Sequence, residues 1–491
     1  MYEENFYEEC GKIVDVIHKT KQSVKNMVYK SSIKDKRKLM ALLCSYFAVA
    51  HKIDNIIKSQ IIKHDTISKY LLKVFIYEYY FGFGKSYLLL KKLREHNLLI
   101  IFKKMKQKIK ALYTINMEAI STQTLKYVRI NTIKIKEYLA VKKLTDQDFY
   151  LSIFVSDLYT KQFDYLKHFY KDYRNRNKFF KDTNIPNLYI FSPKCDLHEN
   201  DLYKDGCLII QDKFSCIPAH ILNPPENSIV IDACASPGNK TSHLASIMKN
   251  TGLIYAVEQD SNRMKVIKNR LPKFGIKESE NIMCIQDDFT SLNPLDPRFS
   301  NVRYILVDPS CTGSGIFKRV ETQSLSSDAL NGLNCPDRIS RLATFQSKIL
   351  LHAFSFPAVK KVVYSTCSIN FEENESVIKE VYKNVRQDFY LAPVMMKEFP
   401  TLRGSYYHEN FHPENSQKLE KLRTFYEKCL RTVPFKPHKT EHFSKNKSKS
   451  AIKKQKNDDV AIDPEYLENF EIIENGFFVA LFIKRKVALI K

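Results

Sequence analysis

The chain has no tryptophan, little glycine and no pair of cysteines in CxxC spacing. Only 12 of its 491 residues are glycine, and its 11 cysteines are an odd number scattered along the chain. Scattered cysteines without that spacing support neither a zinc site nor a framework of disulfides. We therefore expect no bound metal and a reducing compartment, either the cytosol or the nucleus.

Long apolar runs are also missing. The best candidate, residues 71–81, reads LLKVFIYEYYF and is interrupted by Lys73 and Glu78. A membrane-spanning helix needs about 18 or more apolar residues. The first twelve residues are acidic and contain no apolar stretch, so no secretory signal is expected there. The sequence predicts that a membrane is not a partner.

Basic residues are what the chain has in excess. Lys and Arg number 78 against 54 Asp and Glu, which gives a net charge of +24. Such an excess suits an anionic partner, with nucleic acid as the first candidate and an acidic membrane surface as the second. AT-rich coding would also enrich Lys, Ile, Asn, Tyr and Phe, so composition alone does not decide between these readings.

Three regions follow from changes of pattern along the chain. Residues 1–115 show helical apolar spacing without a proline, which predicts an N-terminal helical domain. Residues 120–205 mix strand-like and helix-like segments and predict a small α/β module. From 206 to 491, short apolar strands alternate with helices, apart from a polar, basic stretch at 436–459 that we expect to be a disordered insertion.

The alternation in the last region predicts a mostly parallel sheet with helices on both faces, a Rossmann-like α/β fold. Strands are expected at SIVIDAC, LIYAVE, YILVDPS and KVVYSTCS, with a last strand at GFFVALFIKRK. In such sheets, ligands bind beyond the carboxyl ends of the strands.

A turn of mostly small residues follows the first of these strands and precedes a helix. Its residues are Cys234, Ala235, Ser236, Pro237, Gly238, Asn239 and Lys240. Small side chains let a ligand approach the backbone, and free amides at a helix start can hold a carboxylate such as that of a methionine moiety. The GxGxxG pattern is absent, so an ordinary connection from strand to helix is an equally good interpretation of the turn alone.

Two acidic residues extend this candidate cofactor site. Glu258 follows the second strand, 20 residues after Gly238 (258 − 238), where a carboxylate can accept hydrogen bonds from ribose hydroxyls. Asp288 follows the next strand and could accept from an adenine amino group, although an aspartate in that position is more often a helix cap. A carboxylate ligand for ribose fits S-adenosylmethionine and NAD equally well.

Two cysteines separate those alternatives. Asp308-Pro-Ser-Cys311 follows the fourth strand and Ser-Thr-Cys367 follows the fifth. Carbon 5 of cytosine becomes nucleophilic enough for methylation only after a thiolate adds to carbon 6. Asp308, if protonated, could donate to the ring nitrogen, and a second cysteine could help product release. Methylation of an exocyclic amine needs no thiol, and a dehydrogenase has no use for either cysteine.

These motifs resemble the Sun-type, or RsmB-like, RNA cytosine-carbon-5 methyltransferases. The matching segments are QDKFS at 211–215, DACASPGNKTSHLA, DPSCTGSG and YSTCS. The resemblance implies a class I methyltransferase domain, S-adenosylmethionine as cofactor and RNA as partner, with the small α/β module binding RNA. It assigns Cys367 as the nucleophile and Cys311 to assistance or product release. It places cofactor contacts at Cys234–Lys240, Glu258, Arg263, Asp288 and Asp308.

Most members of the family have a second proline in the Asp-Pro-Pro-Cys motif, where this chain has Ser310. With serine at this position, the chain resembles the NSUN subfamily that modifies large-subunit ribosomal RNA. Ser236 departs from the family's usual alanine, and Glu258 from its commoner aspartate. The resemblance implies a ribosomal RNA substrate and a nuclear, nucleolar location, with the cytoplasm as the alternative. Transfer RNA remains open as a substrate. A non-catalytic RNA-binding assembly factor also remains open, although both cysteines and Asp308 are present.

Overall fold

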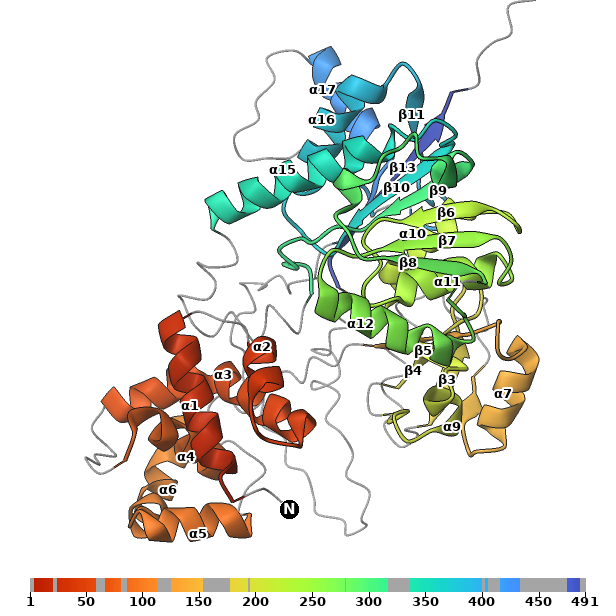
Figure 1. Ribbon diagram of the computed structural model, residues 1–491. Coiled ribbons are helices and arrows are strands. Elements are labelled where there is room, and N and C mark those ends of the chain that lie inside the picture. The colour runs from red at the N-terminus through yellow and green to blue at the C-terminus, as the bar shows by residue number, and fades with distance from the viewer. Residues whose placement is uncertain are drawn as a thin grey trace, which may run out of the picture. The chain divides into compact units, whose positions relative to one another are not determined.

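The computed structural model, shown in Figure 1, contains a helical unit and a larger unit built on two sheets. Contacts between residues assign 1–121 to the first unit, and 122–316 together with 339–491 to the second. The insertion expected at 436–459 lies outside the described residues. The structure describes residues 4–20, 24–58, 67–80, 86–113, 125–152, 177–192, 195–278, 280–316, 335–399, 402–404, 416–432 and 475–485.

The first unit is made of helices packed around one apolar core. Its helices are α1 (Phe6–Thr20), α2 (Val24–Lys30), α3 (Lys36–Lys58), α4 (Lys69–Tyr80), α5 (Tyr87–Glu95) and α6 (Leu99–Tyr113). Every residue of α4 from Leu71 to Glu78 is buried, so this helix is central. Aromatic side chains such as Tyr46 and Phe75 fill the core between the helices. Among the described residues, no helix is long and apolar enough to cross a membrane.

A five-stranded sheet opens the second unit. Its order is β2-β3-β4-β1-β5, and β1 runs antiparallel to both β4 and β5. β5 belongs to this sheet although it follows residue 205 in the chain. The elements are β1 (Lys126–Ile130), α7 (Glu137–Thr145), β2 (Tyr150–Leu151), β3 (Lys178–Lys181), β4 (Leu188–Phe191), α9 (Asp201–Lys204) and β5 (Leu208–Ile210).

The larger sheet has the order β11-β13-β10-β9-β6-β7-β8, with β12 paired to β13 off this path. The neighbours from β10 to β8 are all parallel, whereas β13 is antiparallel to β10, β11 and β12. The strands are β6 (Ile229–Asp232), β7 (Leu253–Val257), β8 (Ile282–Ile285), β9 (Val302–Val307), β10 (Lys361–Thr366), β11 (Phe389–Ala392), β12 (Leu430–Thr432) and β13 (Phe477–Lys484).

Helices cover both faces of this sheet, as Figure 1 shows. Val230 of β6 packs into a cluster that contains Leu222, Leu244 and Ile267, from helices on one face. Ile231, the next residue, packs into the cluster on the other face, which holds side chains of α15 and α16. The prediction of a Rossmann-like α/β fold is confirmed. The remaining helices are α10 (Lys213–Leu222), α11 (Asn239–Ile247), α12 (Ser261–Arg270), α15 (Pro336–Ala353), α16 (Glu375–Val385) and α17 (Ser416–Tyr426), with 3-10 turns η3 (Pro272–Phe274), η4 (Phe289–Ser291) and η5 (Pro297–Phe299).

Candidate active site

The turn after β6 leads directly into the N-terminus of α11. Gly238 has φ +93°, a conformation that suits glycine, and the preceding Ser236–Pro237 peptide is cis. Gly238 occupies the N-cap position, and no side chain caps the helix there. The first amides of α11 therefore remain available to a ligand carboxylate, which is the group that the sequence predicts at this turn.

Arg270, at the end of α12, makes hydrogen bonds to this turn. Its Nη1 donates to the carbonyl of Pro237 at 3.0 Å, and its Nη2 donates to Oδ1 of Asn239 at 2.9 Å. The guanidinium also lies over the ring of Phe274, 5.3 Å from its centroid. Sequence reasoning did not identify Arg270, because an arginine in the last turn of a helix ordinarily reads as a surface residue.

Glu258 and Arg263 lie together beside the same turn. Oε2 of Glu258, which is 5% exposed, is 3.2 Å from Nη2 of Arg263. Its Oε1 accepts from the backbone amide of Asp260 at 3.0 Å, and Asp260 in turn caps α12. Nη2 of Arg263 also donates to the carbonyl of Ser236 at 3.4 Å. The structure thus brings Glu258 and Arg263, both predicted to contact the cofactor, to the turn at residues 234–240 (the cofactor turn). The carboxylate of Glu258 is held in place by these bonds.

Asp288 is a cap. Its Oδ1 accepts from the backbone amide and the hydroxyl of Thr290 at 2.8 and 3.0 Å, which starts η4. This is the structural role that the sequence already offered as the alternative to an adenine contact. Because a carboxylate has two oxygens and several lone pairs, capping through Oδ1 leaves room for a ligand at Oδ2.

Cys311 and Cys367 meet above neighbouring parallel strands. Cys311 follows β9 and Cys367 follows β10, and their sulfur atoms are 3.3 Å apart. The pKa of Cys311 is raised well above the usual range of a thiol by its hydrogen bond with Cys367, by burial, and by the charges of Cys367 and Glu373. Cys311 is therefore held as a thiol at neutral pH.

Asp308 and Lys240 connect the cofactor turn to the cysteines. Oδ2 of Asp308 is 2.6 Å from Nζ of Lys240, and its Oδ1 accepts from the hydroxyl of Ser365 at 2.5 Å. Burial lowers the pKa of Lys240, but Asp308 and Cys367 raise it by more, so the net shift is upward. A protonated amine next to Cys367 favours the thiolate that a nucleophile requires. The sequence placed Lys240 only at the cofactor; the structure also pairs it with Asp308 and brings it within range of a charge interaction with Cys367.

Arg129 of β1 is a second residue that sequence reasoning missed. Its side chain is fully buried and reaches from the five-stranded sheet to the start of α11. Nε donates to Oε1 of Gln211 at 3.0 Å, and Nη2 donates to Oγ of Ser242 at 2.8 Å and to the carbonyl of Asn239 at 3.4 Å. Burial lowers its pKa to about 10, which leaves it charged at neutral pH. The five-stranded sheet and α11 are therefore joined by hydrogen bonds to one buried cation.

The N-terminus of α11 has no side-chain cap and can bind a methionine carboxylate, and Cys311 and Cys367 face each other nearby. Together these features define an S-adenosylmethionine-dependent methyltransferase. Residues 219–426 match the family of the 16S rRNA methyltransferase RsmB/F. Residues 124–211 match the ferredoxin-like domain of NOL1/NOP2/Sun domain family member 5, which corresponds to the five-stranded sheet. The chain belongs to this Sun-type RsmB/F family of RNA cytosine-C5 methyltransferases, enzymes that use S-adenosylmethionine.

Relatives from two animals extend over most of the chain. The 28S rRNA (cytosine-C(5))-methyltransferase of Mus musculus is 33% identical over 405 residues, which are 79% of this chain and 83% of the relative. The 26S rRNA (cytosine-C(5))-methyltransferase nsun-5 of Caenorhabditis elegans is 33% identical over 81% of this chain and 91% of its own. The crystal structure of PH0851 matches with a TM-score of 0.56 at 18% identity, covering 99% of both chains, and supports the fold.

Proposed function

We propose that this methyltransferase acts on a cytosine of large-subunit ribosomal RNA and that Cys367 is its nucleophile. The substrate is supported by the two relatives above, whose names specify 28S and 26S rRNA. The chemistry rests on one observation, the pair of sulfur atoms 3.3 Å apart, with Asp308 bonded to Ser365, two residues before Cys367. Bisulfite sequencing of ribosomal RNA from cells with and without the protein tests the substrate, because loss of one large-subunit 5-methylcytosine is expected without it. The same measurement in cells that carry Cys367→Ala tests the nucleophile.

In this proposal, the thiolate of Cys367 adds to carbon 6 of the base and makes carbon 5 nucleophilic. S-adenosylmethionine supplies the methyl group. The carboxylate of Asp308 accepts from the exocyclic amine, and the ammonium of Lys240 provides the proton that offsets charge at the ring nitrogen. A water molecule then accepts the carbon-5 proton, and the bond between carbon 6 and the sulfur of Cys367 breaks with its electron pair returning to sulfur. The ring nitrogen returns its proton to Lys240, which restores the aromatic ring and the ammonium.

Cys311 acts later in this cycle, when the sulfur of Cys367 leaves carbon 6. Its thiol stays protonated, because its pKa is raised by the hydrogen bond with Cys367 and by burial, and so it does not compete as a nucleophile. At 3.3 Å it can donate to the departing sulfur of Cys367. This division of roles agrees with what the family resemblance implies for the two positions.

The cofactor assignment predicts distinct results for two substitutions of Asp288. Asp288→Asn keeps an oxygen that can cap η4 but replaces the other with an amide that repels an adenine amino group. We expect the affinity for S-adenosylmethionine to fall about 10-fold, the worth of one hydrogen bond, with the melting temperature retained. Asp288→Ala should lose both the affinity and about 1 kcal/mol of stability. Equal calorimetric affinity in wild type and both variants would remove Asp288 from the cofactor site.

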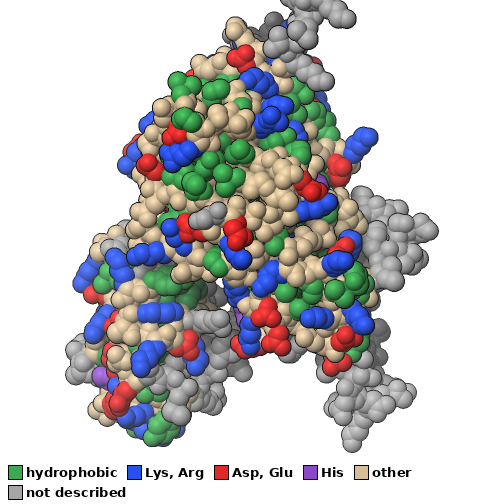
Figure 2. Space-filling view, turned by 45° about the vertical axis from the view of Figure 1, so that its right-hand side comes forward, with side chains coloured by type: hydrophobic (Ala, Val, Ile, Leu, Met, Phe, Trp, Pro, Cys, Tyr) green, Lys and Arg blue, Asp and Glu red, His purple; other side chains and the backbone are tan. Residues whose placement is uncertain are grey.

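RNA binding is expected to depend steeply on salt. The chain has a net charge of +24, and Figure 2 shows Lys and Arg side chains spread over the visible face. If about six phosphates are contacted, affinity should fall about 1,000-fold between 50 and 200 mM salt through counterion release. Filter binding with ribosomal RNA measures this slope. Affinity that does not change with salt would contradict an electrostatic interface, and a variant lacking residues 436–459 should keep its catalytic rate.

The proposed substrate also sets the expected location. Large-subunit ribosomal RNA is assembled in the nucleolus, so we propose a nuclear, nucleolar protein. Imaging of the tagged full-length chain tests this, and a purely cytoplasmic signal would favour either late ribosomal particles or transfer RNA as the substrate.

A further inference from the structure

Glu373 is a fully buried carboxylate that contacts two loops, the Cys311 loop after β9 and the Cys367 loop after β10. It lies just before α16, and its two carboxylate oxygens accept five hydrogen bonds, all from neutral groups. On the Cys311 side, Oε1 accepts from the amide of Thr312 at 2.9 Å, and Oε2 accepts from its hydroxyl at 2.5 Å. On the Cys367 side, Oε2 accepts from the hydroxyl of Ser368 at 2.5 Å. The residue after each cysteine is thus bound to the same carboxylate.

Two amide side chains complete the arrangement around this carboxylate. Gln346 donates through Nε2 to Glu373 and to the carbonyl of Ser310, both at 3.0 Å, so Cys311 is held on both flanks. Asn370 donates to Oε2 of Glu373 at 3.0 Å. The two loops also meet at Ser314, whose hydroxyl lies 3.1 Å from that of Ser368.

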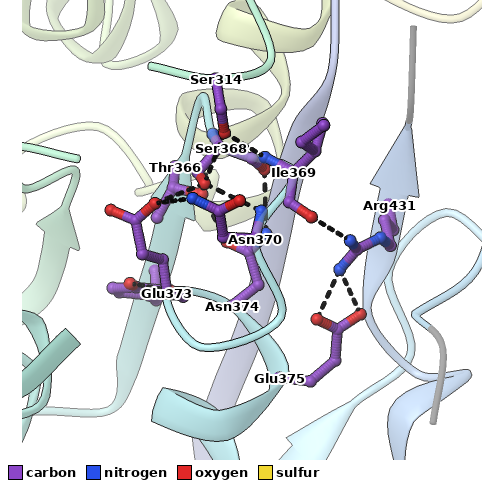
Figure 3. Close-up of polar contacts among 10 residues, drawn as sticks. Ser314, Thr366, Ser368, Ile369, Asn370, Glu373, Asn374, Glu375 and Arg431 are labelled. Atoms are coloured by element: carbon purple, nitrogen blue, oxygen red, sulfur yellow. Dashed lines mark hydrogen bonds and ion pairs between the residues drawn. The ribbon is translucent and has the colours of Figure 1, made fainter. Parts of the chain in front are cut away.

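The two residues after Glu373 fix the Cys367 loop, as Figure 3 shows. Asn374 accepts from the hydroxyl of Thr366 at 2.5 Å and donates to the carbonyl of Ser368 at 2.9 Å, on either side of the cysteine. Glu375 forms an ion pair with Arg431, which also donates to the carbonyl of Ile369. The Cys367 loop therefore has its own supports, whereas Glu373 is bound by both loops.

We propose that Glu373 is a positioning residue that sets the separation of the two catalytic thiols. This inference rests on the proposed roles of Cys367 and Cys311. Their chemistry needs one sulfur bonded to carbon 6 while the other stays within reach of it, and reacting groups lose rate steeply when they are misplaced by about 1 Å. A buried carboxylate with five donors is rigid, because each broken bond leaves an unsatisfied polar group. The two loops cannot separate without breaking bonds to it.

The charge of Glu373 has a second effect on the same pair. It is one of the groups that raise the pKa of Cys311, after the hydrogen bond with Cys367, burial and the charge of Cys367. Removing that negative charge should lower the pKa of Cys311. This shift provides a signal that a residue with a purely structural role would not produce.

The test is Glu373→Gln in the full-length protein, with Glu380→Gln on the exposed face of α16 as the matched control. Methyl transfer is measured with S-adenosylmethionine and ribosomal RNA from cells lacking the protein. We expect kcat to fall about 100-fold while KM for S-adenosylmethionine stays within about 2-fold. Alkylation of Cys311 by iodoacetamide, followed by peptide mass spectrometry, should begin at lower pH than in wild type. The control should match wild type in both measurements.

Unchanged kcat and an unchanged alkylation profile in Glu373→Gln would overturn the inference. If this variant does not fold, Thr312→Val and Ser368→Ala each remove one hydroxyl bonded to the carboxylate, on different loops. Each should lower kcat about 10-fold, and the double variant should lose less than the product, because both act through Glu373. Normal rates in both single variants would also overturn it. If wild type itself transfers no methyl group to the RNA, the proposed function fails instead.

Discussion

Replacement of Cys367 by alanine is expected to abolish both methyl transfer and any covalent adduct with RNA. Among the described residues, Cys311 is the other thiol of the site, and it stays a poor nucleophile in this variant because burial and the charge of Glu373 still raise its pKa when the hydrogen bond with Cys367 is gone. Loss of a nucleophile of this kind costs about 10⁴-fold or more in rate. The measurement is transfer of labelled methyl to RNA, with a denaturing gel to detect the adduct.

Cys311→Ala should give the opposite result on the gel. Attack by Cys367 remains possible, but release slows, so a covalent adduct should accumulate while turnover falls. Cys284→Ala, in β8 and away from both loops, is the matched cysteine control and should behave as wild type. An adduct with Cys367→Ala and none with Cys311→Ala would show that the two roles are reversed. The target base must also leave its stack to reach either thiol, which favours an unpaired cytosine.

Of the substitutions proposed for this protein, Arg129→Met is expected to lower the free energy of unfolding the most. The substitution keeps a long apolar stem but leaves the side-chain oxygen of Gln211 and the hydroxyl oxygen of Ser242 in α11 without their buried donor. Unsatisfied buried acceptors cost about 1–3 kcal/mol each, so we expect a loss of about 3 kcal/mol and a melting temperature roughly 4 °C lower for a unit of this size. Affinity for S-adenosylmethionine should fall as well, because the carbonyl of Asn239 lies in the cofactor turn.

Arg303→Met, an exposed arginine on β9, is the matched control and should change the free energy of unfolding by less than about 0.5 kcal/mol. Thermal unfolding with and without cofactor measures both quantities. A melting temperature of Arg129→Met equal to that of wild type would mean that the five-stranded sheet and α11 do not depend on this buried cation.

The sheet and the positions of the motifs could be predicted from the sequence because they depend on local patterns. Each apolar strand from β6 to β10 is flanked by a helix, and parallel strands place their carboxyl ends at one edge. That rule alone brings Asp308 and Cys367 together and puts Glu258 beside Gly238. The capping role of Asp260 is equally local, because it depends on the amide three residues ahead.

The groups that hold the site could not be predicted, because their partners are distant in sequence. Arg129 lies in an alternating strand, where a charged residue ordinarily faces solvent, yet it bonds to Ser242, 113 positions away. The sequence pattern after the fifth strand predicts a helix from Glu372, which makes Glu373 and Asn374 part of its first turn. The helix instead begins at Glu375, because the preceding side chains bind the cysteine loops. Only the fold shows these carboxylate and amide groups to be internal.

The place of β13 bears on how the protein is made. This strand, Phe477–Lys484, lies between β10 and β11 and pairs along the whole length of β10, which leads into Cys367. A ribosome synthesises β10 more than a hundred residues before it reaches β13. Until then, one edge of β10 lacks its partner strand and is open to pairing with other chains. Assembly of the catalytic centre therefore follows synthesis, and a nascent chain would benefit from a chaperone during that interval.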